Sequence, residues 1–353
     1  MRVLFVPSLL ACAATAVLHY GAKDLTILGR HSQEGELSWP SSAYSFAVSC
    51  AGEAALRMTF AAQEGTSFYL GVWVDKKEAA RFHINTTNRD VFFGLATSAE
   101  VRLVRVSEAN YSTTTGVMQL ENLVIDNGVL LPPEQEEKRL LFIGDSLTCG
   151  YGNLGTDPCS FDASTEDVMQ SYPSVLADLL AAPLGLAPAV HTVCYSGKGV
   201  VRNYNGSAPD LTMPVYYNRS IATQEGSYWD PLLFPANVVY IMLGSNDYST
   251  EPVPQAATFV DKYLDFLRRV ANDYPSAEIL AACAPQHWEH HPDQCAGIKV
   301  AEAAFKREGG AVQYVQPAVS ATSSYGCDGH PSAQMHRQIA ESLLLTFLSA
   351  LKV

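Results

Sequence analysis

Residues 140–148 read Leu-Leu-Phe-Ile-Gly-Asp-Ser-Leu-Thr, and this stretch indicates the fold class. Four apolar side chains end at Gly144, which is typical of a buried strand closed by a turn. Ser146 then follows at the carboxyl edge of the expected sheet, where α/β folds place their ligands. The nucleophile elbow of α/β-hydrolases requires Gly-x-Ser-x-Gly, but position 148 is threonine. Ser146 is therefore a candidate nucleophile on a different α/β fold, or else an ordinary helix N-cap.

The chain after residue 138 alternates between strand-like and helix-like segments. Strand patterns occupy residues 139–144, 190–194, 238–244, 278–284 and 311–315. One helix pattern covers residues 256–273, and a last helix carries an apolar face of Ile339, Leu343, Phe347 and Leu351. Such alternation predicts βαβ units and a parallel sheet with helices on both faces. We assign residues 139–353 to this α/β domain.

Residues 26–130 have a different texture, with short β-like runs separated by turn residues. Regularly spaced runs rich in β-branched and aromatic residues predict an antiparallel sandwich of the jelly-roll type. The runs are residues 44–48, 55–60, 67–74, 80–84, 90–95, 101–106 and 116–125. Residues 131–138, Leu-Pro-Pro-Glu-Gln-Glu-Glu-Lys, predict a polar, proline-stiffened linker between the two domains.

The composition suits a globular protein and argues against several kinds of partner. Of the 353 residues, 48% are hydrophobic and 17% are charged, and the net charge is −13. Because no basic stretch interrupts the acidic balance, we expect neither nucleic acid nor an anionic membrane as a partner. Residues 1–16 have the apolar run and the Ala-Thr-Ala site of a signal peptide, which predicts secretion. Four Asn-x-Ser/Thr sequons fit a secreted glycoprotein: Asn85, Asn110, Asn205 and Asn218.

The eight cysteines become seven when Cys12 leaves with the signal peptide. An odd number in an oxidising compartment leaves at least one thiol unpaired. By proximity in the sequence we expect the bridges Cys149–Cys159 and Cys283–Cys295. The remaining cysteines are not assigned: Cys50, Cys194 and Cys327. The histidines near the second pair match no standard zinc spacing, so no metal site is expected.

Three further motifs stand at the carboxyl ends of predicted strands or just before the last helix. They are Tyr-Ser-Gly-Lys-Gly at 195–199, Gly-Ser-Asn-Asp at 244–247 and Cys-Asp-Gly-His-Pro-Ser at 327–332. Because the carboxyl ends of parallel strands converge, these loops can meet above the sheet. Each motif taken singly is typical of a turn or a helix start. All of them together with Ser146, in this order, indicate one shared site.

Such a site would provide the groups that ester hydrolysis requires. The Ser146 hydroxyl is a weak nucleophile until a base accepts its proton, and His330 is the candidate base. Asp328 is the candidate residue that orients the imidazole and stabilises the imidazolium. The candidate donors to the oxyanion are the main-chain N–H groups of Ser146 and Gly197 and the side-chain amide of Asn246.

The four blocks resemble those of the SGNH, or GDSL, hydrolase superfamily, with Ser146, Gly197, Asn246 and His330 at the named positions. The layout of a jelly roll followed by Ser-Gly-Lys-Gly and Asp-Gly-His-Pro-Ser blocks is similar to carbohydrate esterase family two. This resemblance implies a three-layer, flavodoxin-like α/β domain that needs no cofactor and no metal. It also implies removal of acetyl groups from polysaccharides such as xylan, mannan and glucomannan, with preference for primary 6-hydroxyl esters.

One spacing departs from the superfamily pattern. The superfamily usually has Asp-x-x-His, whereas only Gly329 separates Asp328 from His330. Some members of carbohydrate esterase family two orient the histidine through a backbone carbonyl, so both arrangements stay open for this chain. Position 329 is aromatic in some relatives and is glycine here, so a sugar-stacking contact is absent at that position.

Other side chains near the motifs have alternative interpretations. Trp288 follows the fourth predicted strand, and its indole is either a sugar-binding surface or a cover for the domain seam. Tyr228 and Trp229 are expected in the core. Asp145 is expected to be a structural hydrogen-bonding residue, and Lys198 a solvated charge.

These features together predict a secreted, monomeric serine esterase that deacetylates polysaccharide or oligosaccharide. Two alternatives remain. The first is lipase, thioesterase or arylesterase action on the same fold, which chain-length preference on simple esters would distinguish. The second is a glycan-binding module with little turnover, in which loss of Ser146 would leave binding intact.

Overall fold

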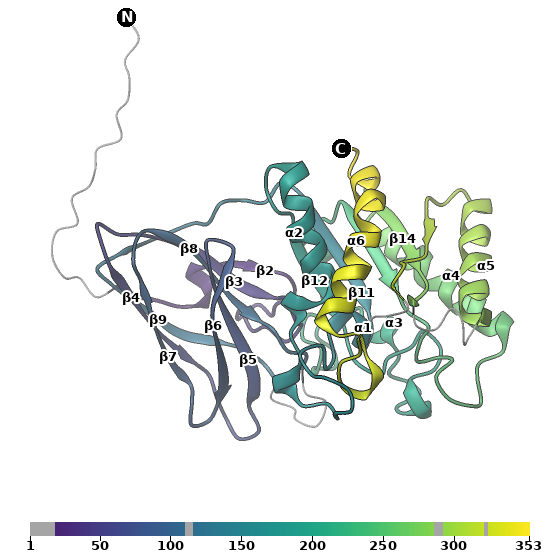
Figure 1. Cartoon of the computed structure of the whole chain (residues 1–353), viewed down its shortest axis with the longest axis horizontal. Helices are drawn as coiled ribbons and strands as arrows, with labels where there is room; N and C mark the ends of the chain where they lie inside the picture. Colours follow the sequence, from purple (N-terminus) through teal and green to yellow (C-terminus); the bar gives the residue numbers. More distant parts are fainter. Residues whose placement is uncertain (1–17, 110–115, 286–291, 321–323) are drawn as a thin grey trace, which may run out of the picture.

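The structure, a computed structural model, consists of two parts that lie side by side (Figure 1). It describes residues 18–109, 116–285, 292–320 and 324–353. Strands β1 to β10 form two antiparallel sheets in the N-terminal part, and a five-stranded parallel sheet forms the centre of the C-terminal part. The predicted fold class, a β-sandwich followed by an α/β domain with a parallel sheet, is confirmed.

The N-terminal sandwich has sheets of strand order β1-β9-β4-β7 and β10-β3-β8-β5-β6, with β2 paired to β3. Its strands bury alternate side chains, as β4 does with Leu56, Met58 and Phe60. This period of two turns one side of each strand toward the core between the sheets. The bounds are β1 Leu18–Tyr20, β2 Thr26–Leu28, β3 Ala43–Ser49, β4 Ala54–Phe60, β5 Ser67–Val74, β6 Lys77–Asn85, β7 Asp90–Leu95, β8 Ala99–Arg105, β9 Leu120–Asp126 and β10 Val129–Leu131.

The C-terminal sheet has the strand order β12-β11-β13-β14-β15, and all its strands are parallel. Counted along the chain this order is 2-1-3-4-5, which is the flavodoxin-like arrangement. Its elements are β11 Arg139–Gly144, α1 Ser146–Cys149, α2 Tyr172–Leu184, β12 Ala189–Cys194, α3 Met213–Tyr216, β13 Val238–Met242, α4 Ala256–Asp273, β14 Glu278–Ala282, α5 Pro292–Arg307, β15 Gln313–Val315 and α6 Ala333–Ala350.

Both faces of the parallel sheet are covered. From β11, Leu140 and Phe142 pack with α2 and α6, which Figure 1 shows side by side. Leu141 and Ile143 point to the opposite face and pack in the cluster that includes α4 and α5. A strand buried on both faces needs apolar residues at every position, which explains the continuous apolar run in the sequence.

The predicted boundaries are most accurate around the central strand, where residues 139–144 and 256–273 coincide with β11 and α4. Strands β13 and β14 end earlier than predicted, at Met242 and Ala282. Leu243 and Cys283 continue the apolar run because they are buried in the loops beyond the last paired residue. In the sandwich, the predicted run 116–125 pairs as a strand only from Leu120. No helix within the described ranges has both the length and the apolar content for crossing a membrane.

The segment predicted as a linker lies against the sandwich. Strand β10 includes Leu131 and pairs with β3. Glu134 forms an ion pair with Lys76 at 3.3 Å, and Glu136 pairs with Arg102. These contacts hold the polar connection to the outer face of one sheet rather than leaving it extended in solvent.

The sandwich also reaches into the α/β part. Trp39 is fully buried and belongs to the hydrophobic core on the α4 and α5 side of the parallel sheet. On the edge strand β12, the main-chain N–H of Thr192 donates to Ser41 Oγ at 2.9 Å, and Thr192 Oγ1 donates to the carbonyl of Pro40 at 2.8 Å. Covering an edge strand in this way removes a surface that could pair with another chain.

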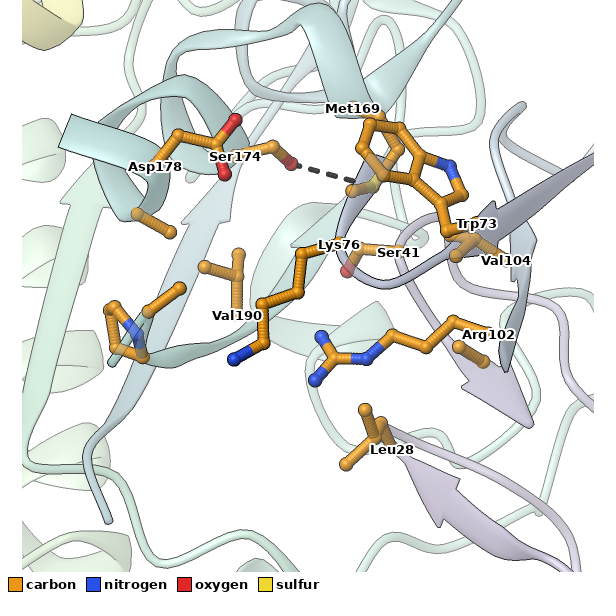
Figure 2. Close-up of a pocket in the computed structure, with 14 residues that line it drawn as sticks. Leu28, Ser41, Trp73, Lys76, Arg102, Val104, Met169, Ser174, Asp178 and Val190 are labelled. Carbon is orange, nitrogen blue, oxygen red and sulfur yellow. Dashed lines mark hydrogen bonds between the residues drawn. The ribbon is translucent and has the colours of Figure 1, made fainter. Parts of the chain in front are cut away.

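A small cavity of about 70 Å³ remains at the seam between the two parts. Figure 2 shows Trp73 and Arg102 from the sandwich on one side of it, Asp178 and Val190 from the α/β part on the other, and Lys76 of the sandwich between them. The two cations around it are those already paired with the glutamates of the 131–138 segment.

The described residues form three disulfides: Cys149–Cys194, Cys159–Cys327 and Cys283–Cys295. The predicted Cys283–Cys295 bridge is confirmed, and the predicted Cys149–Cys159 bridge is wrong. Cys149 lies just beyond β11 and Cys194 ends β12, and because these strands are neighbours the two Cα atoms come within 5.5 Å. Cys50 is the unpaired thiol of the described chain.

Candidate active site

Ser146 begins α1 directly after the central strand β11. Because β11 lies between β12 and β13, the strand order reverses there, which is where open α/β sheets bind ligands. Asp145 caps the helix, since its carboxylate accepts a hydrogen bond from the Leu147 main-chain N–H at 3.1 Å. Gly144 has φ +114°, and a Cβ there would lie 1.9 Å from Thr148 Oγ1. Only glycine therefore allows the strand to turn so sharply into the helix.

His330 contacts the Ser146 hydroxyl, with 2.9 Å between Nε2 and Oγ. Its other ring nitrogen, Nδ1, lies 3.2 Å from the main-chain carbonyl oxygen of Asp328. The Asp328 carboxylate accepts hydrogen bonds from Tyr151 Oη and the main-chain N–H of Phe161, both at 2.9 Å. Of the two arrangements left open by the sequence, the structure has the one in which a backbone carbonyl contacts the imidazole.

The loop that carries His330 is held from one side by the segment after α1. The disulfide Cys159–Cys327 joins the two loops three residues before the histidine. The Tyr151 ring lies 4.2 Å from the imidazole of His330, centroid to centroid. Asp328 has φ +52°, a left-handed conformation that places its carbonyl toward the ring and its carboxylate toward Tyr151. The histidine therefore depends on this neighbouring loop for its orientation.

The three predicted oxyanion donors differ in how free they are. Within the described ranges, the main-chain N–H groups of Ser146 and Gly197 have no hydrogen-bond acceptor. The Asn246 amide nitrogen donates to the carbonyl of Lys198 at 3.0 Å and to Asp145 Oδ2 at 3.2 Å. The bond to Lys198 brings Asn246 and the Gly197 loop together, beside Ser146 at the switch point.

Asp247, which the sequence suggested only as part of a turn, anchors the loop that follows Gly197. Its carboxylate accepts three consecutive main-chain hydrogen bonds, at 2.6 to 2.9 Å, from Val200, Val201 and Arg202. Burial raises the pKa of Asp247 to about 6, and these N–H groups lower it again. The block at 244–247 thus has two tasks, with Asn246 at the cavity and Asp247 beneath it.

A cavity of about 420 Å³ opens in front of Ser146 and His330. Tyr204 and Tyr325 line it and are strongly exposed, at 55% and 46%. Exposed aromatic rings beside a polar cluster of this kind are suited to the apolar face of a sugar. The other lining residues are Leu147, Asp157, Ser245, Asn246, Ser249, Asp328 and Gly329. Trp288, the predicted substrate-binding residue, lies outside the described residues.

A model of the GDSL-like lipase/acylhydrolase family matches residues 140–343, which is more than half of the chain. The chain belongs to this family. This GDSL-family chain is also 31% identical over 278 residues to a cellulase/esterase, CelE, of Acetivibrio thermocellus, covering 76% of the chain and 33% of that protein. An acetylxylan esterase / glucomannan deacetylase of Cellvibrio japonicus is 27% identical over 167 residues, which is 47% of the chain and 45% of that protein. The chain thus spans less than half the length of these two relatives.

Solved structures match over nearly the whole chain. A carbohydrate esterase family 2 enzyme of Corynascus thermopiles (Myceliophthora fergusii) has a TM-score of 0.79 and 27% identity, covering 93% of this chain and 100% of that one. A family two carbohydrate esterase from Clostridium thermocellum, solved with cellohexaose, has a TM-score of 0.79 and 26% identity, covering 93% and 99%. The predicted resemblance to the GDSL hydrolases and to carbohydrate esterase family two is confirmed.

Several side chains of this GDSL-family chain lie elsewhere than expected. Lys198 is not a solvated charge, since it is buried with Nζ 4.5 Å from the Tyr216 ring centroid and 5.6 Å from that of Tyr195. Desolvation lowers the pKa of Lys198 to about 8. Trp229 is in the core as expected, but Tyr228 is 69% exposed. A lysine between two glycines carries no sequence signal for burial, because its partners come from distant segments.

Tyr204 and Tyr325 were not singled out from the sequence, although a signal existed. Each is an aromatic residue a few positions from a motif block, one after residues 195–199 and one before residues 327–332. Binding and catalytic residues lie more often in loops than in the core. Aromatic residues in loops at the carboxyl edge of a sheet are therefore candidates for substrate contact.

One group of side chains has donor atoms close enough together to suggest a metal. Carboxylate oxygens of Glu108 and Glu166 and the sulfur of Cys149 lie within 4.8 Å of one another. Cys149 is in a disulfide, so it has no thiolate to offer. Arg105 is fully buried beside both glutamates, and its guanidinium supplies the positive charge that a metal ion would otherwise provide. The cluster fits a structural role better than a metal site.

The acid limb of the profile of kcat/KM against pH is expected to have its midpoint below pH 6.5. Burial lowers the pKa of His330 from its ordinary 6.5, so the neutral imidazole persists to lower pH. The rate constant kcat/KM reports the free enzyme, and it should fall only as pH drops through this lowered pKa. We would measure kcat/KM for 4-nitrophenyl acetate from pH 4 to 9.

The control for this profile is Asp145→Asn, because burial raises the pKa of Asp145 to about 7. If the midpoint of the acid limb is the same in this variant, the group that titrates is His330 and not Asp145. A limb centred above pH 6.5 in both proteins would contradict the expectation.

Proposed function

We propose that this chain is a secreted serine esterase that removes O-acetyl groups from polysaccharides or oligosaccharides of the xylan, mannan or glucomannan type. The observation that carries the proposal is the 2.9 Å contact between His330 Nε2 and Ser146 Oγ in an open cavity flanked by exposed tyrosines. The relatives named as acetylxylan esterase / glucomannan deacetylase support the substrate class.

In the first half of the reaction, Ser146 Oγ attacks the acetyl carbonyl while His330 Nε2 takes the hydroxyl proton. The main-chain carbonyl of Asp328 accepts a hydrogen bond from Nδ1–H of His330 and so favours the tautomer in which Nε2 is the base. The tetrahedral intermediate then collapses. The bond from acetyl carbon to sugar oxygen breaks, and that oxygen takes the proton from the imidazolium.

In the second half, water attacks the acetyl-enzyme and His330 removes its proton. The carbon–Oγ bond breaks, Ser146 recovers a proton from the imidazolium, and acetate leaves. The negative oxygen in both halves is stabilised by the main-chain N–H groups of Ser146 and Gly197, which are free in the described structure. Asn246 is the third donor. Its amide gives up the hydrogen bond to Asp145, which is the longer of its two bonds, and donates that hydrogen to the oxyanion instead.

The substrate-binding part of the proposal rests on the tyrosines. Tyr204 and Tyr325 present rings to the cavity, and ring faces of this kind pack against a pyranose. They take the place of the aromatic residue that is absent at Gly329. Trp288 stays in the proposal as a third candidate for sugar contact, on the basis of its position in the sequence.

Secretion, a monomeric state and the division into units at 26–130, 131–138 and 139–353 are part of the same proposal. Secretion is supported by the signal pattern of residues 1–16 and by the sequons. Among these, Asn205 is exposed next to Tyr204, whereas the Oδ1 atom of Asn218 is buried. A glycan is therefore more compatible with Asn205 than with Asn218.

Acetate release from acetylated xylan and acetylated glucomannan tests this proposal. The chain is expected to release acetate from at least one of them, and a Ser146→Ala variant is the blank. On 4-nitrophenyl esters the rate should fall steeply beyond acetate, because the cavity is lined mainly by polar groups and tyrosines.

Two results would overturn the proposed acetyl esterase function. Equal or greater rates on octanoate than on acetate would favour a lipase on the same fold. No release from any acetylated substrate, with retained binding to the polysaccharide, would make the chain a glycan-binding module.

A further inference from the structure

A buried carboxylate of the sandwich reaches the loop that carries Gly197. Glu108 follows strand β8 and is 5% exposed. Its Oε2 accepts a hydrogen bond from the main-chain N–H of Ser196 at 2.8 Å, across the domain seam. Ser196 directly precedes Gly197, whose own N–H has no acceptor among the described residues and is a proposed oxyanion donor.

We infer that Glu108 is a positioning residue for the oxyanion hole, so that the β-sandwich forms part of the catalytic centre. This inference rests on the proposed esterase function. Glu108 does not touch the substrate in this arrangement. It holds the Tyr195–Ser196 peptide through the Ser196 N–H. This restricts the orientation of the next peptide, Ser196–Gly197, which carries the Gly197 N–H.

The start of the loop is also held by the Cys149–Cys194 disulfide and by two main-chain bonds at 3.3 Å, from the Tyr195 N–H to the Gly144 carbonyl and from the Lys198 N–H to the Tyr195 carbonyl. Glu108 adds a side-chain bond on the upstream side of Gly197, at Ser196. Gly197 has φ +78°, a left-handed conformation without a side chain to hold it. Downstream the loop is well anchored, since Asp247 accepts three main-chain bonds from residues 200–202. Asn203 Oδ1 accepts another from Gly199. Upstream, the Glu108 bond to Ser196 is a matching side-chain anchor, and Gly197 lies between the two.

Glu108 itself is rigidly held. Its carbonyl accepts from Arg105 Nη2 at 3.1 Å, and its main-chain N–H donates to Glu166 Oε2 at 2.9 Å. Arg105 and Glu166 are both fully buried. A carboxylate is costly to bury, and one main-chain N–H can be satisfied by an ordinary carbonyl at lower cost. Glu108 thus has a contact with the loop in addition to its place in the buried cluster with Arg105 and Glu166.

The charge on Glu108 is not what the inference requires. Burial raises the pKa of Glu108 to about 7, and burial together with Glu108 raises that of Glu166 well above its usual range. Arg105 and Lys198 act in the opposite direction on Glu108. Around neutral pH the pair thus holds at least part of a proton, and a neutral glutamine reproduces the protonated side chain. Reach and hydrogen bonding should matter more than charge.

Three variants test this: Glu108→Ala, Glu108→Gln and Glu108→Asp. Removing an oxyanion donor typically costs about 10² to 10³ in kcat, and a misdirected donor loses a part of that. We expect Glu108→Ala to lower kcat about 10- to 100-fold with KM nearly unchanged, because the donor acts in the transition state. Glu108→Gln keeps the reach and the acceptor and should stay within about threefold of the unchanged chain. Glu108→Asp keeps the charge but is one methylene short, so it should fall below Gln.

The rates are measured on 4-nitrophenyl acetate and divided by the active sites titrated with diethyl 4-nitrophenyl phosphate. The matched control is Asp167→Asn, which removes another buried carboxylate at the same seam, where it pairs with Arg81 at 3.3 Å. This control should lose stability and keep kcat.

A Glu108→Ala protein with unchanged kcat per active site would overturn the inference. If the alanine variant does not fold, a higher kcat for Glu108→Asp than for Glu108→Gln would overturn the inference. The charge of the side chain, and not its length, would then determine kcat. No turnover by the unchanged chain would overturn the proposed function, and the inference with it. Turnover by the unchanged chain with equal kcat in all variants would overturn the inference and leave the function standing.

Discussion

Ser146→Ala and His330→Ala are each expected to lower kcat by about 10⁶, and the double variant by no more than either one. The hydroxyl and the imidazole act as one unit through the contact at 2.9 Å, so removal of either group ends nucleophilic catalysis. The remaining rate would come from binding and from the oxyanion donors. Acetate release from an acetylated oligosaccharide measures this, with kcat obtained from single-turnover experiments for the slow variants.

Asp328→Asn is the control for this prediction. Asparagine tolerates the left-handed backbone at this position, and it leaves the main-chain carbonyl that contacts His330 Nδ1. Only the side-chain bonds to Tyr151 and Phe161 change, so the expected loss is about tenfold or less. A loss as large as that of His330→Ala would mean that the carboxylate supports the imidazole. Additive losses in the Ser146/His330 double variant would contradict the single unit.

Removal of the Cys159–Cys327 bridge, as Cys159→Ala/Cys327→Ala, is expected to lower kcat about 100-fold. The bridge ties the His330 loop to the segment that carries Tyr151 and Phe161, and small displacements of a catalytic base cost about this much. Native bridges are also worth about 2–5 kcal/mol of stability. We would therefore measure kcat per titrated active site at a temperature well below the Tm of each protein.

The matched control is Cys283→Ala/Cys295→Ala, which removes a bridge between the end of β14 and α5. This variant should unfold at a lower temperature than the unchanged chain but keep its kcat. If both double variants lost activity to the same extent, the loss would reflect general stability and not the placement of His330. Full activity without the Cys159–Cys327 bridge would show that stacking on Tyr151 is enough.

The sequence was sufficient to predict the parallel sheet and the proximity of Ser146 and His330. Strands buried on both faces must be apolar at every position, so β11 and β13 appear as continuous runs that no exposed strand would show. Ser146 and His330 were recognisable because parallel strands bring their carboxyl ends to one edge, whatever lies between them in the chain. Helix α4 was equally clear from its one-sided apolar face.

Local sequence patterns could not predict the disulfide pairing or the group that contacts the imidazole of His330. Cys149 pairs with Cys194 and not with the nearer Cys159, because pairing follows strand adjacency rather than distance along the chain. The Asp328 carbonyl, and not its carboxylate, contacts His330, because a left-handed backbone turns the side chain away. Neither result has a signature in residue types.

The largest difference concerns the sandwich. Sequence patterns predicted it as a separate unit, since its strands have their own period and their own core. In the folded chain its Trp39 lies in the core of the other domain, and its Glu108 bonds to Ser196, 88 residues further on. Local periodicity reports which face of an element is buried, but the partner of a buried polar group depends on how complete elements pack against each other. The candidate site at Ser146 was therefore predictable from four short motifs taken together, whereas the contacts that support it required both domains in place.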